Sequence, residues 1–319
     1  RSPIAMRGAS LALYSGARLG PQCGACSTGG ATRRSVERAP CPAGRTPSLT
    51  STDSCQTSCV SNADKVSSFG TVGYVKLPDA VPAEVISSMR AGTWEALGAR
   101  GIAERDPSTW ARSDCQTWIA VKPTCSGLDA VGPDDSPAVR LLLDELLGPT
   151  RSSGRNWGKT LVALPERDSV WSVPRTAWHF DHLYRSPGVV TAVNLFLLID
   201  DVAPRGGGTA VVRNSPQLLD RLLGSGAQYS RVSEQNRSFI ASTEWTRGLT
   251  ASPSARTAER TARYTTETIV EGIPMRVDEL CGSAGDVFVC HPALLHTISM
   301  NVSSRPRLMR VQRIHTTNS

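Results

Sequence analysis

The chain has 319 residues, 39% of them hydrophobic and 20% charged, which is enough to bury a full core in one large domain. The formal net charge of +7 would suit a nucleic-acid partner, but residues 1–50 alone hold seven arginines, no lysine and one acid, Glu37. The rest of the chain is near neutral, so we expect no nucleic-acid-binding surface. We also expect no membrane span, because the longest apolar run, residues 189–199, is about half of the ~20 residues that a helical span requires.

Residues 1–65 are expected to form a tail that precedes the folded domain. They show no sustained hydrophobic periodicity, and their first part is rich in Arg, Ser, Gly and Ala and poor in acids. An organelle transit peptide has this composition, and a disordered extension without a targeting role explains it equally well. The nine cysteines, an odd number with no regular spacing beyond the tail, fit a reducing compartment. We therefore expect an intracellular protein, either cytoplasmic or organelle-targeted.

Two helices are predicted near the start of the folded domain, which we place at residues 66–319. A short strand at residues 73–78 opens this domain. A helix follows from Pro82, because proline suits the first turn of a helix and apolar residues recur at roughly helical spacing after it, namely Val85, Ile86, Met89, Trp94 and Leu97. A second helix is predicted over residues 137–147, where Leu and Val residues form an apolar stripe.

Beyond residue 159 the chain is predicted to be mostly β. Short apolar runs alternate with Pro, Gly, Asp and Ser, a pattern typical of sandwiches and barrels. Eight such strands suggest a double-stranded β-helix of the jelly-roll or cupin type, braced by the N-terminal helices. The candidate strands are residues 160–165, 170–173, 177–181, 189–199, 208–213, 286–291, 294–300 and 306–314.

A long polar segment interrupts these strands at residues 216–270. Its helical patterning is modest and is confined to the surroundings of residues 218–223. A segment of this length inside a compact domain is usually a functional lid or a disordered loop. We expect a lid over the site.

His179 and Asp181 are candidate metal ligands. On a strand, side chains two residues apart emerge from the same face, so these two would point into the barrel. Trp178, Phe180 and His182 would then point the other way. The pair alone is more often a surface turn or a hydrogen-bonded core pair, so a third ligand is needed to support a metal site.

The third ligand is expected from the C-terminal part of the chain. His296 is predicted on a strand amid apolar residues, whereas His291 precedes Pro292 in a turn, and a ligand benefits from a rigid element. We therefore favour His296. Two histidines and one carboxylate on a shared face can hold a non-haem Fe(II) and leave coordination positions open. Such positions suit a bidentate 2-oxo acid and then O2.

An arginine and an asparagine are expected to complete the site. A guanidinium offers planar, paired donors to the distal carboxylate of a co-substrate. Arg305 and Arg307 both follow His296 with the same strand parity, so periodicity does not separate them, and a solvated edge-strand position is the alternative for each. Asn194 interrupts an otherwise apolar strand, which makes it a candidate contact for substrate or co-substrate; the alternative is a hydrogen-bonded core amide.

These residues resemble the Fe(II)- and 2-oxoglutarate-dependent dioxygenases of the phytanoyl-CoA dioxygenase type. The resemblance implies that His179, Asp181 and His296 bind iron. It also implies that an arginine eleven residues beyond the distal histidine binds 2-oxoglutarate, which selects Arg307, and that Thr209 after the glycine run is a second co-substrate contact. The resemblance covers residues 70–315, and its strongest blocks are residues 178–181, 195–209, 285–296 and 301–307.

The sequence departs from the family pattern in two places. Residues 213–216 read Arg-Asn-Ser-Pro where Pro-Gly-Ser-His is common, and residues 296–298 read His-Thr-Ile where His-Gly-Ser is common. The co-substrate pocket is therefore expected to be modified. Asp181 argues against halogenation, since family halogenases have a small residue at this position. The resemblance implies hydroxylation of a small organic substrate, of a lipid, acyl or secondary-metabolite type, with release of succinate and CO2; the alternative is an inactive jelly-roll protein that binds or senses a small molecule.

Overall fold

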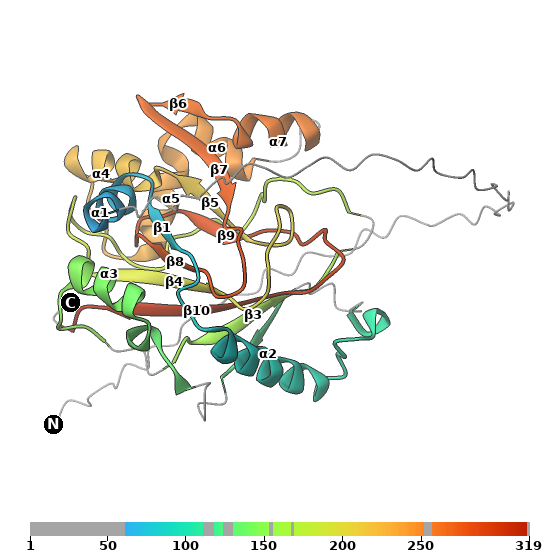
Figure 1. The fold of residues 1–319 in the computed structure, drawn as a ribbon. Helices are drawn as coiled ribbons and strands as arrows, with labels where there is room; N and C mark the ends of the chain where they lie inside the picture. The colour runs from blue at the N-terminus through green and yellow to red at the C-terminus, as the bar shows by residue number, and fades with distance from the viewer. Residues whose placement is uncertain are drawn as a thin grey trace, which may run out of the picture. The chain divides into compact units, whose positions relative to one another are not determined.

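The computed structural model describes residues 61–110, 118–123, 130–152, 156–166, 169–251 and 257–317. The expected tail at residues 1–65 lies outside the described residues except for positions 61–65. Within the described part, the strands form a six-stranded and a four-stranded sheet (Figure 1). All neighbouring strands in both sheets are antiparallel.

The six-stranded sheet has the order β1-β8-β4-β10-β3-β2. Every residue of β4 is buried, because helices cover one face of this sheet and the second sheet lies over the other. Asn194 of β4 lies opposite Cys290 of β8 and Arg313 of β10. The strands are β1 (Tyr74–Leu77), β2 (Trp118–Val121), β3 (Lys159–Ala163), β4 (Ala192–Leu198), β8 (Val287–Cys290) and β10 (Arg307–His315).

The four-stranded sheet has the order β6-β7-β5-β9. In β7 the buried residues Ile273, Met275 and Val277 alternate with less buried ones, so the strand presents one apolar face to the core. This strand was not among those predicted. The strands are β5 (Thr209–Arg213), β6 (Thr268–Val270), β7 (Ile273–Glu279) and β9 (His296–Ile298).

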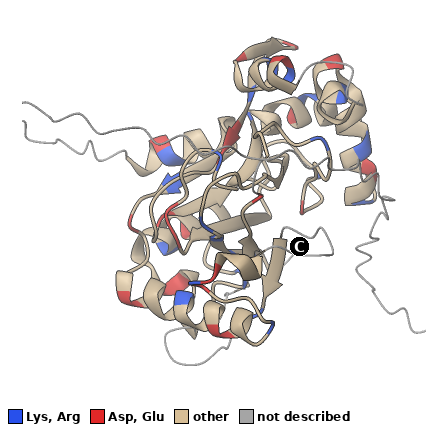
Figure 2. Ribbon diagram, turned by 90° about the vertical axis from the view of Figure 1, so that its right-hand side faces the viewer, with Lys and Arg blue, Asp and Glu red and all other residues tan. Residues whose placement is uncertain are grey.

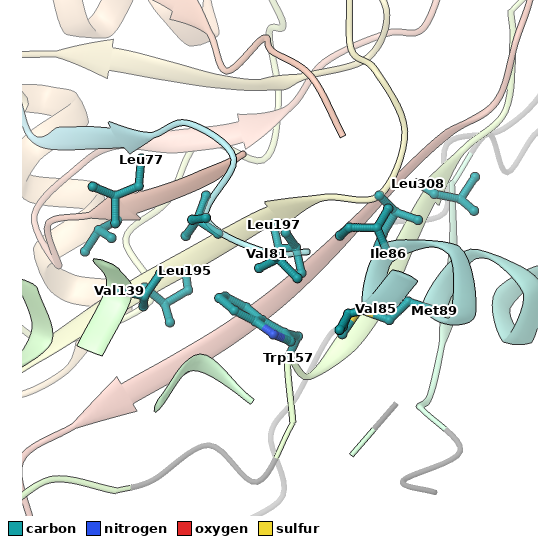
Figure 3. Packing of buried hydrophobic residues seen from close by; sticks show 14 of the residues in the cluster. Leu77, Val81, Val85, Ile86, Met89, Val139, Trp157, Leu195, Leu197 and Leu308 are labelled. Atoms are coloured by element: carbon teal, nitrogen blue, oxygen red, sulfur yellow. The ribbon is translucent and has the colours of Figure 1, made fainter. Parts of the chain in front are cut away.

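Helices cover the outer face of each sheet. Helices α1 (Asn62–Thr71), α2 (Ala83–Gly98) and α3 (Pro137–Leu147) share an apolar cluster with the six-stranded sheet. Figure 3 shows part of this cluster, in which Val85, Ile86 and Met89 of α2 lie beside the strands. The four-stranded sheet shares a second cluster with α4 (Ser215–Gly224), α5 (Val232–Ser242), α6 (Glu244–Thr250) and α7 (Thr257–Thr265).

A third apolar cluster fills the layer between the two sheets. It joins Phe196 of β4 and Met309 of β10 to Val211 of β5, so both sheets contribute to it. Side chains alternate along a strand, and Arg307 and Arg313 therefore share the inward face of β10 with Met309. This layer between the sheets carries the candidate site residues.

Two expectations about local structure are corrected. The fold is mixed rather than mostly β, because the described residues between positions 215 and 265 form four helices. The strands expected at residues 170–173 and 177–181 do not form; the segment makes a single β-bridge, between His179 and His296. Pro174 offers no N–H to a ladder, and Ala177 has a left-handed backbone (φ 60°), so regular pairing is interrupted before His179.

Charges of both signs are interspersed along the described ribbon (Figure 2). Arg90 of α2 illustrates this pattern, since its guanidinium pairs with Glu104 at 2.5 Å and with Asp200 at 2.7 Å. In the part of the chain that the structure describes, no helix combines the length and the apolar character needed to cross a membrane.

Candidate metal centre

His179 and His296 lie directly opposite each other at the edge of the four-stranded sheet. His296 opens β9, and its backbone N–H and carbonyl exchange hydrogen bonds with those of His179 at 3.1 and 3.0 Å. This pairing brings the two imidazole rings together, with centroids 4.5 Å apart. Phe196 of the opposite sheet packs edge-on against the ring of His296. The two histidines therefore reach the layer between the sheets.

Asp181 completes a group of three ligands. Its Oδ1 is 3.6 Å from Nε2 of His179, and its Oδ2 is 3.4 Å from Nε2 of His296. The three ligand atoms lie within 4.8 Å of one another, and the described residues contain no other such group of His, Cys, Asp or Glu. Ligand atoms about 2.1 Å from one ion are roughly 3 Å apart at right angles, so small side-chain shifts bring this set onto one ion. The donor set is that of a non-haem iron site.

The hydrogen bonds of the two imidazoles decide which nitrogen is free for a metal. Nδ1 of His179 lies 2.7 Å from the carbonyl oxygen of Ala177, and Nδ1 of His296 lies 3.0 Å from that of Leu294. A carbonyl oxygen only accepts, so each Nδ1 carries a proton, and Nε2 is the nitrogen that faces Asp181 and would bind a metal in its deprotonated form. Metal-binding histidines commonly have such a carbonyl behind them, which fixes both tautomer and ring orientation.

Asp181 is a buried carboxylate surrounded by donors. Its side chain is 6% exposed, and Nη2 of Arg313 donates to its Oδ1. Burial raises the pKa of Asp181, but hydrogen bonds with His179 and His296 and the charge of Arg313 outweigh burial and hold the pKa well below its ordinary value. Burial alone would lower the pKa of His179, and its hydrogen bonds with Asp181 and Ala177 raise it above the ordinary value instead. Asp181 is therefore ionised at neutral pH, as a metal ligand must be.

The two candidate arginines, Arg307 and Arg305, differ in burial and in their contacts. Arg307 opens β10 and is 3% exposed, and burial lowers its pKa to about 10. Its Nε and Nη1 donate to the carbonyl oxygens of Gly207 and Leu161 at 2.7 and 3.0 Å. Arg305 is exposed. A buried guanidinium whose acceptors are neutral carbonyls keeps its charge for an anion, so Arg307 is better placed than Arg305 to meet a carboxylate.

The glycine run before β5 shapes the surroundings of Arg307. Gly207 has a left-handed backbone (φ 79°), and a Cβ there would lie 2.8 Å from Cβ of Asn301, so a larger residue would displace the carbonyl that Arg307 uses. Thr209 opens β5, is buried, and has its Oγ1 3.8 Å from Sδ of Met309. Met309 and Arg307 share one face of β10, so Thr209 and Arg307 border the same interior.

Asn194 lies inside the fold and contacts a histidine that the sequence pattern did not indicate. It is 1% exposed, and its Oδ1 lies 3.0 Å from Nε2 of His182. Trp178 and Phe180 belong to the second apolar cluster, which lies between the four-stranded sheet and its helices. They therefore point away from the metal ligands, as predicted. His182 does not follow them, because the backbone bends at residues 181 and 182 and the two-residue alternation ends there.

His291 lies outside the group of three ligands. It is 3% exposed, and its Nδ1 accepts a hydrogen bond from the backbone N–H of Ala293 at 3.0 Å. The rings of Phe69 and Tyr184 pack against it, with centroids 5.0 and 5.1 Å away. His291 is thus a core residue whose Nδ1 already accepts a hydrogen bond and whose ring packs against aromatic side chains.

The buried His291 is expected to make the fold sensitive to acid. Burial lowers its pKa to about 3, whereas an exposed histidine titrates at about 6.5. Between these values the unfolded chain binds a proton that the folded chain does not, so the free energy of unfolding should fall by about 1.4 kcal/mol per pH unit as the pH drops below ~6.5. His291→Asn keeps an acceptor for Ala293 and should flatten this slope in urea unfolding between about pH 6.5 and 4.5. His315→Asn, at an exposed position, should leave it unchanged, and an unchanged slope in His291→Asn would contradict the prediction.

Helix α5 holds the backbone on both sides of Asp181. The side chain of Gln235 is fully buried; its Oε1 accepts from the N–H of Tyr184 at 3.1 Å, and its Nε2 donates to the carbonyl of Tyr184 at 2.6 Å. Oδ1 of Asn236 accepts from the N–H of Phe180 at 2.8 Å. These side chains supply backbone hydrogen bonds that a strand partner would otherwise provide.

Gln235→Ala is expected to lower the free energy of unfolding by about 2–4 kcal/mol, because two buried backbone groups of Tyr184 lose their partner. Gln217→Ala is the matched control, since this amide donates to the carbonyl of Thr71 at an exposed position and its loss should cost under about 0.5 kcal/mol. Urea unfolding at constant m-value measures both costs. Equal costs would mean that α5 does not support the segment around Asp181.

Comparison with known proteins identifies the family. The family model for phytanoyl-CoA dioxygenase (PhyH) matches residues 69–309. A search of curated proteins finds no match. Solved structures that resemble the chain include the epimerase SnoN in complex with Fe3+, α-ketoglutarate and nogalamycin RO, at 15% identity over 80% of this chain and 83% of that chain, with a TM-score of 0.48. HygX from Streptomyces hygroscopicus, with nickel, 2-oxoglutarate and hygromycin B bound, has 14% identity over 80% of this chain and 87% of that chain, with a TM-score of 0.43.

The family match begins within α1 and ends within β10, so it spans most of the chain and both sheets. It includes every residue that the sequence predicted for the site. Among these, the structure brings His179, Asp181 and His296 together and places Arg307 and Thr209 at a shared interior. The protein therefore belongs to the phytanoyl-CoA dioxygenase family of 2-oxoglutarate-dependent non-haem iron enzymes.

Proposed function

We propose that this protein is an Fe(II)- and 2-oxoglutarate-dependent dioxygenase that hydroxylates a small organic substrate, of a lipid, acyl or secondary-metabolite type, and releases succinate and CO2. The observation that supports this most is the orientation of the ligands. Both Nε2 atoms face the oxygens of Asp181, while both Nδ1 atoms are engaged by backbone carbonyls. The family membership agrees with this assignment.

In this proposal His179, Asp181 and His296 hold the iron from one face. When bound, the iron and 2-oxoglutarate supply the activation of O2. The residues of the chain orient and shield that chemistry. The carbonyls of Ala177 and Leu294 hold the imidazoles in place, and the apolar layer between the sheets limits access of water. The ionised Asp181 carries no proton for the metal to displace.

We assign the distal carboxylate of 2-oxoglutarate to Arg307, with Thr209 as a second contact. The carbonyls of Gly207 and Leu161 hold the guanidinium in position before the co-substrate arrives, which reduces the entropy lost on binding. Asn194 is proposed as a contact of the substrate, since it is buried and belongs to a strand that faces the same layer.

We also propose that residues 66–319 form one dioxygenase domain with a double-stranded β-helix at its centre. Two antiparallel sheets that enclose a buried layer support this proposal. The segment 216–270 is proposed to cover the substrate side of the site. Helix α5 would in addition fix the segment that carries Asp181, because Gln235 and Asn236 bond to the backbone on either side of it.

The proposed function is tested by anaerobic titration of the full chain with Fe(II) and 2-oxoglutarate. We expect a weak visible charge-transfer band that requires both additions. Asp181→Ala removes a ligand and should abolish the band, whereas Asp106→Ala removes an exposed acid and should retain it. A wild-type protein that gives no band under these conditions would overturn the iron assignment.

Turnover distinguishes an enzyme from an inactive binding protein of the same fold. A dioxygenase should release succinate in the presence of a substrate, and we would test acyl-CoA thioesters, free acids and alkaloid-like or polyketide-like molecules. An inactive binding protein would form the band and release no succinate above background with any of them.

A further inference from the structure

Arg313 is a second arginine on the inward face of β10. It lies six residues beyond Arg307, with Met309 and Val311 between them on the same face. At about 3.3 Å per residue the two arginines are roughly 20 Å apart along the strand. Since Met309 belongs to the apolar layer between the sheets and Val311 packs against it, both arginines approach that layer, one at each end of β10.

The two arginines differ in exposure and in partners. The side chain of Arg313 is 47% exposed, whereas Arg307 is 3% exposed and bonds to two backbone carbonyls. Nη2 of Arg313 donates to Oδ1 of Asp181, which is the one hydrogen bond of its guanidinium to any residue that the structure describes. Arg313 thus contacts the buried carboxylate while nearly half of its side chain is exposed to solvent, and it has further N–H groups that make no hydrogen bond to Asp181.

The immediate surroundings of Arg313 are polar but carry little other charge. Asn194 lies directly opposite it in the register of β4 and β10, and His182 is hydrogen-bonded to Asn194. Asp181 is the anion in contact with Arg313, and it is also a proposed metal ligand.

We infer that Arg313 binds a carboxylate of the substrate and that the substrate is therefore an organic acid; this inference rests on the proposed function. A divalent ion bound to Asp181 would take up the negative charge of the carboxylate that otherwise pairs with Arg313, and it would add positive charge nearby. A substrate carboxylate beside Arg313 restores a counter-charge, and the planar guanidinium offers it paired donors. Asn194 and His182 provide further polar contacts at the same edge of the site.

The inference is tested by binding, with the full chain loaded anaerobically with Fe(II) and saturating 2-oxoglutarate. The probes are hexanoate and 3-phenylpropanoate, each compared with its own primary amide, and the readout is perturbation of the visible charge-transfer band. The wild type should bind each acid about 10- to 100-fold more tightly than the amide, the range expected for a hydrogen-bonded ion pair. Arg313→Gln should remove this preference, and Arg313→Lys should retain part of it.

Arg305→Gln is the matched control, because it removes one exposed positive charge near the other end of β10 and should keep the preference for acids. Affinities for Fe(II) and for 2-oxoglutarate should stay within about threefold of wild type in Arg313→Gln. A tenfold or larger loss of Fe(II) affinity in that variant would instead make Arg313 a residue that orients Asp181, and would overturn the inference.

Different outcomes of this titration refute the proposed function and the assignment of Arg313. Absence of the band in the wild type refutes the proposed function whatever the probes do. A normal band that acids do not perturb, or that acids and amides perturb equally, refutes the assignment of Arg313 and leaves the proposed function in place.

Discussion

His296→Ala is expected to weaken the binding of Fe(II) or Co(II) by at least about 100-fold. Changes to residues behind the ligands already cost about 10- to 100-fold, so loss of a ligand itself should cost more. His179 and Asp181 come from one segment, and His296 is the ligand from β9 that closes the face around the ion. Anaerobic titration with Co(II), followed by its visible absorption, measures the affinity.

His291 provides the matched control for this prediction. It is a buried histidine from the same region of the chain, but its ring packs against Phe69 and Tyr184. His291→Asn keeps the acceptor for Ala293 and should bind Co(II) within about threefold of wild type. Near-ultraviolet circular dichroism should show that both variants are folded. Loss of binding in His291→Asn together with retention in His296→Ala would reassign the third ligand.

Elements with strong hydrophobic periodicity were predictable from the sequence alone. Helix α3 spans Pro137–Leu147, the residues predicted, because its apolar residues form one buried stripe. Strand β4 was recognisable from a continuous apolar run, since it is buried on both faces. In both elements most side chains indicate the environment that they occupy; the exceptions are Leu141 of α3, which is 57% exposed, and Asn194 of β4, which is buried.

Helices α5, α6 and α7 depend on partners that are distant in sequence. Their surfaces are largely polar, and each is held by one or two large residues that reach the outer cluster: Phe239 in α5, Trp245 and Leu249 in α6, and Tyr264 in α7. So few anchors leave little periodicity to detect. Arg260 of α7 adds hydrogen bonds to the carbonyls of Val173, Pro174 and Leu249, contacts that no local pattern indicates.

The candidate site shows the same contrast between local and distant information. Residue types and spacing were enough to nominate His179 and Asp181, although the strand expected beneath them is absent and a single β-bridge with support from α5 takes its place. The contact of Arg313 with Asp181 could not be predicted. It depends on how β10 lies relative to a bent segment that is not its strand neighbour, and alternation along either segment does not define that relation.

Arg307→Met is expected to raise the Kd for 2-oxoglutarate by about 30- to 100-fold, which corresponds to the loss of charged hydrogen bonds worth about 2–3 kcal/mol. The cation is buried and its position is fixed by the carbonyls of Gly207 and Leu161, so no neighbouring residue can easily replace it. Arg305→Met removes an exposed side chain and should change the Kd by no more than about twofold. Anaerobic titration of the charge-transfer band at saturating Fe(II) measures the Kd separately from metal binding.

A loss of affinity in Arg307→Met has two physical explanations, because the same substitution also leaves the carbonyls of Gly207 and Leu161 without their donor. The co-substrate can distinguish them. 2-Oxopentanoate lacks the distal carboxylate of 2-oxoglutarate, so an arginine that binds this carboxylate should make the wild type prefer 2-oxoglutarate by about 30- to 100-fold and should lose that preference in Arg307→Met. If the substitution weakens both 2-oxo acids equally, Arg307 supports the shape of the pocket and the carboxylate must be held by another group.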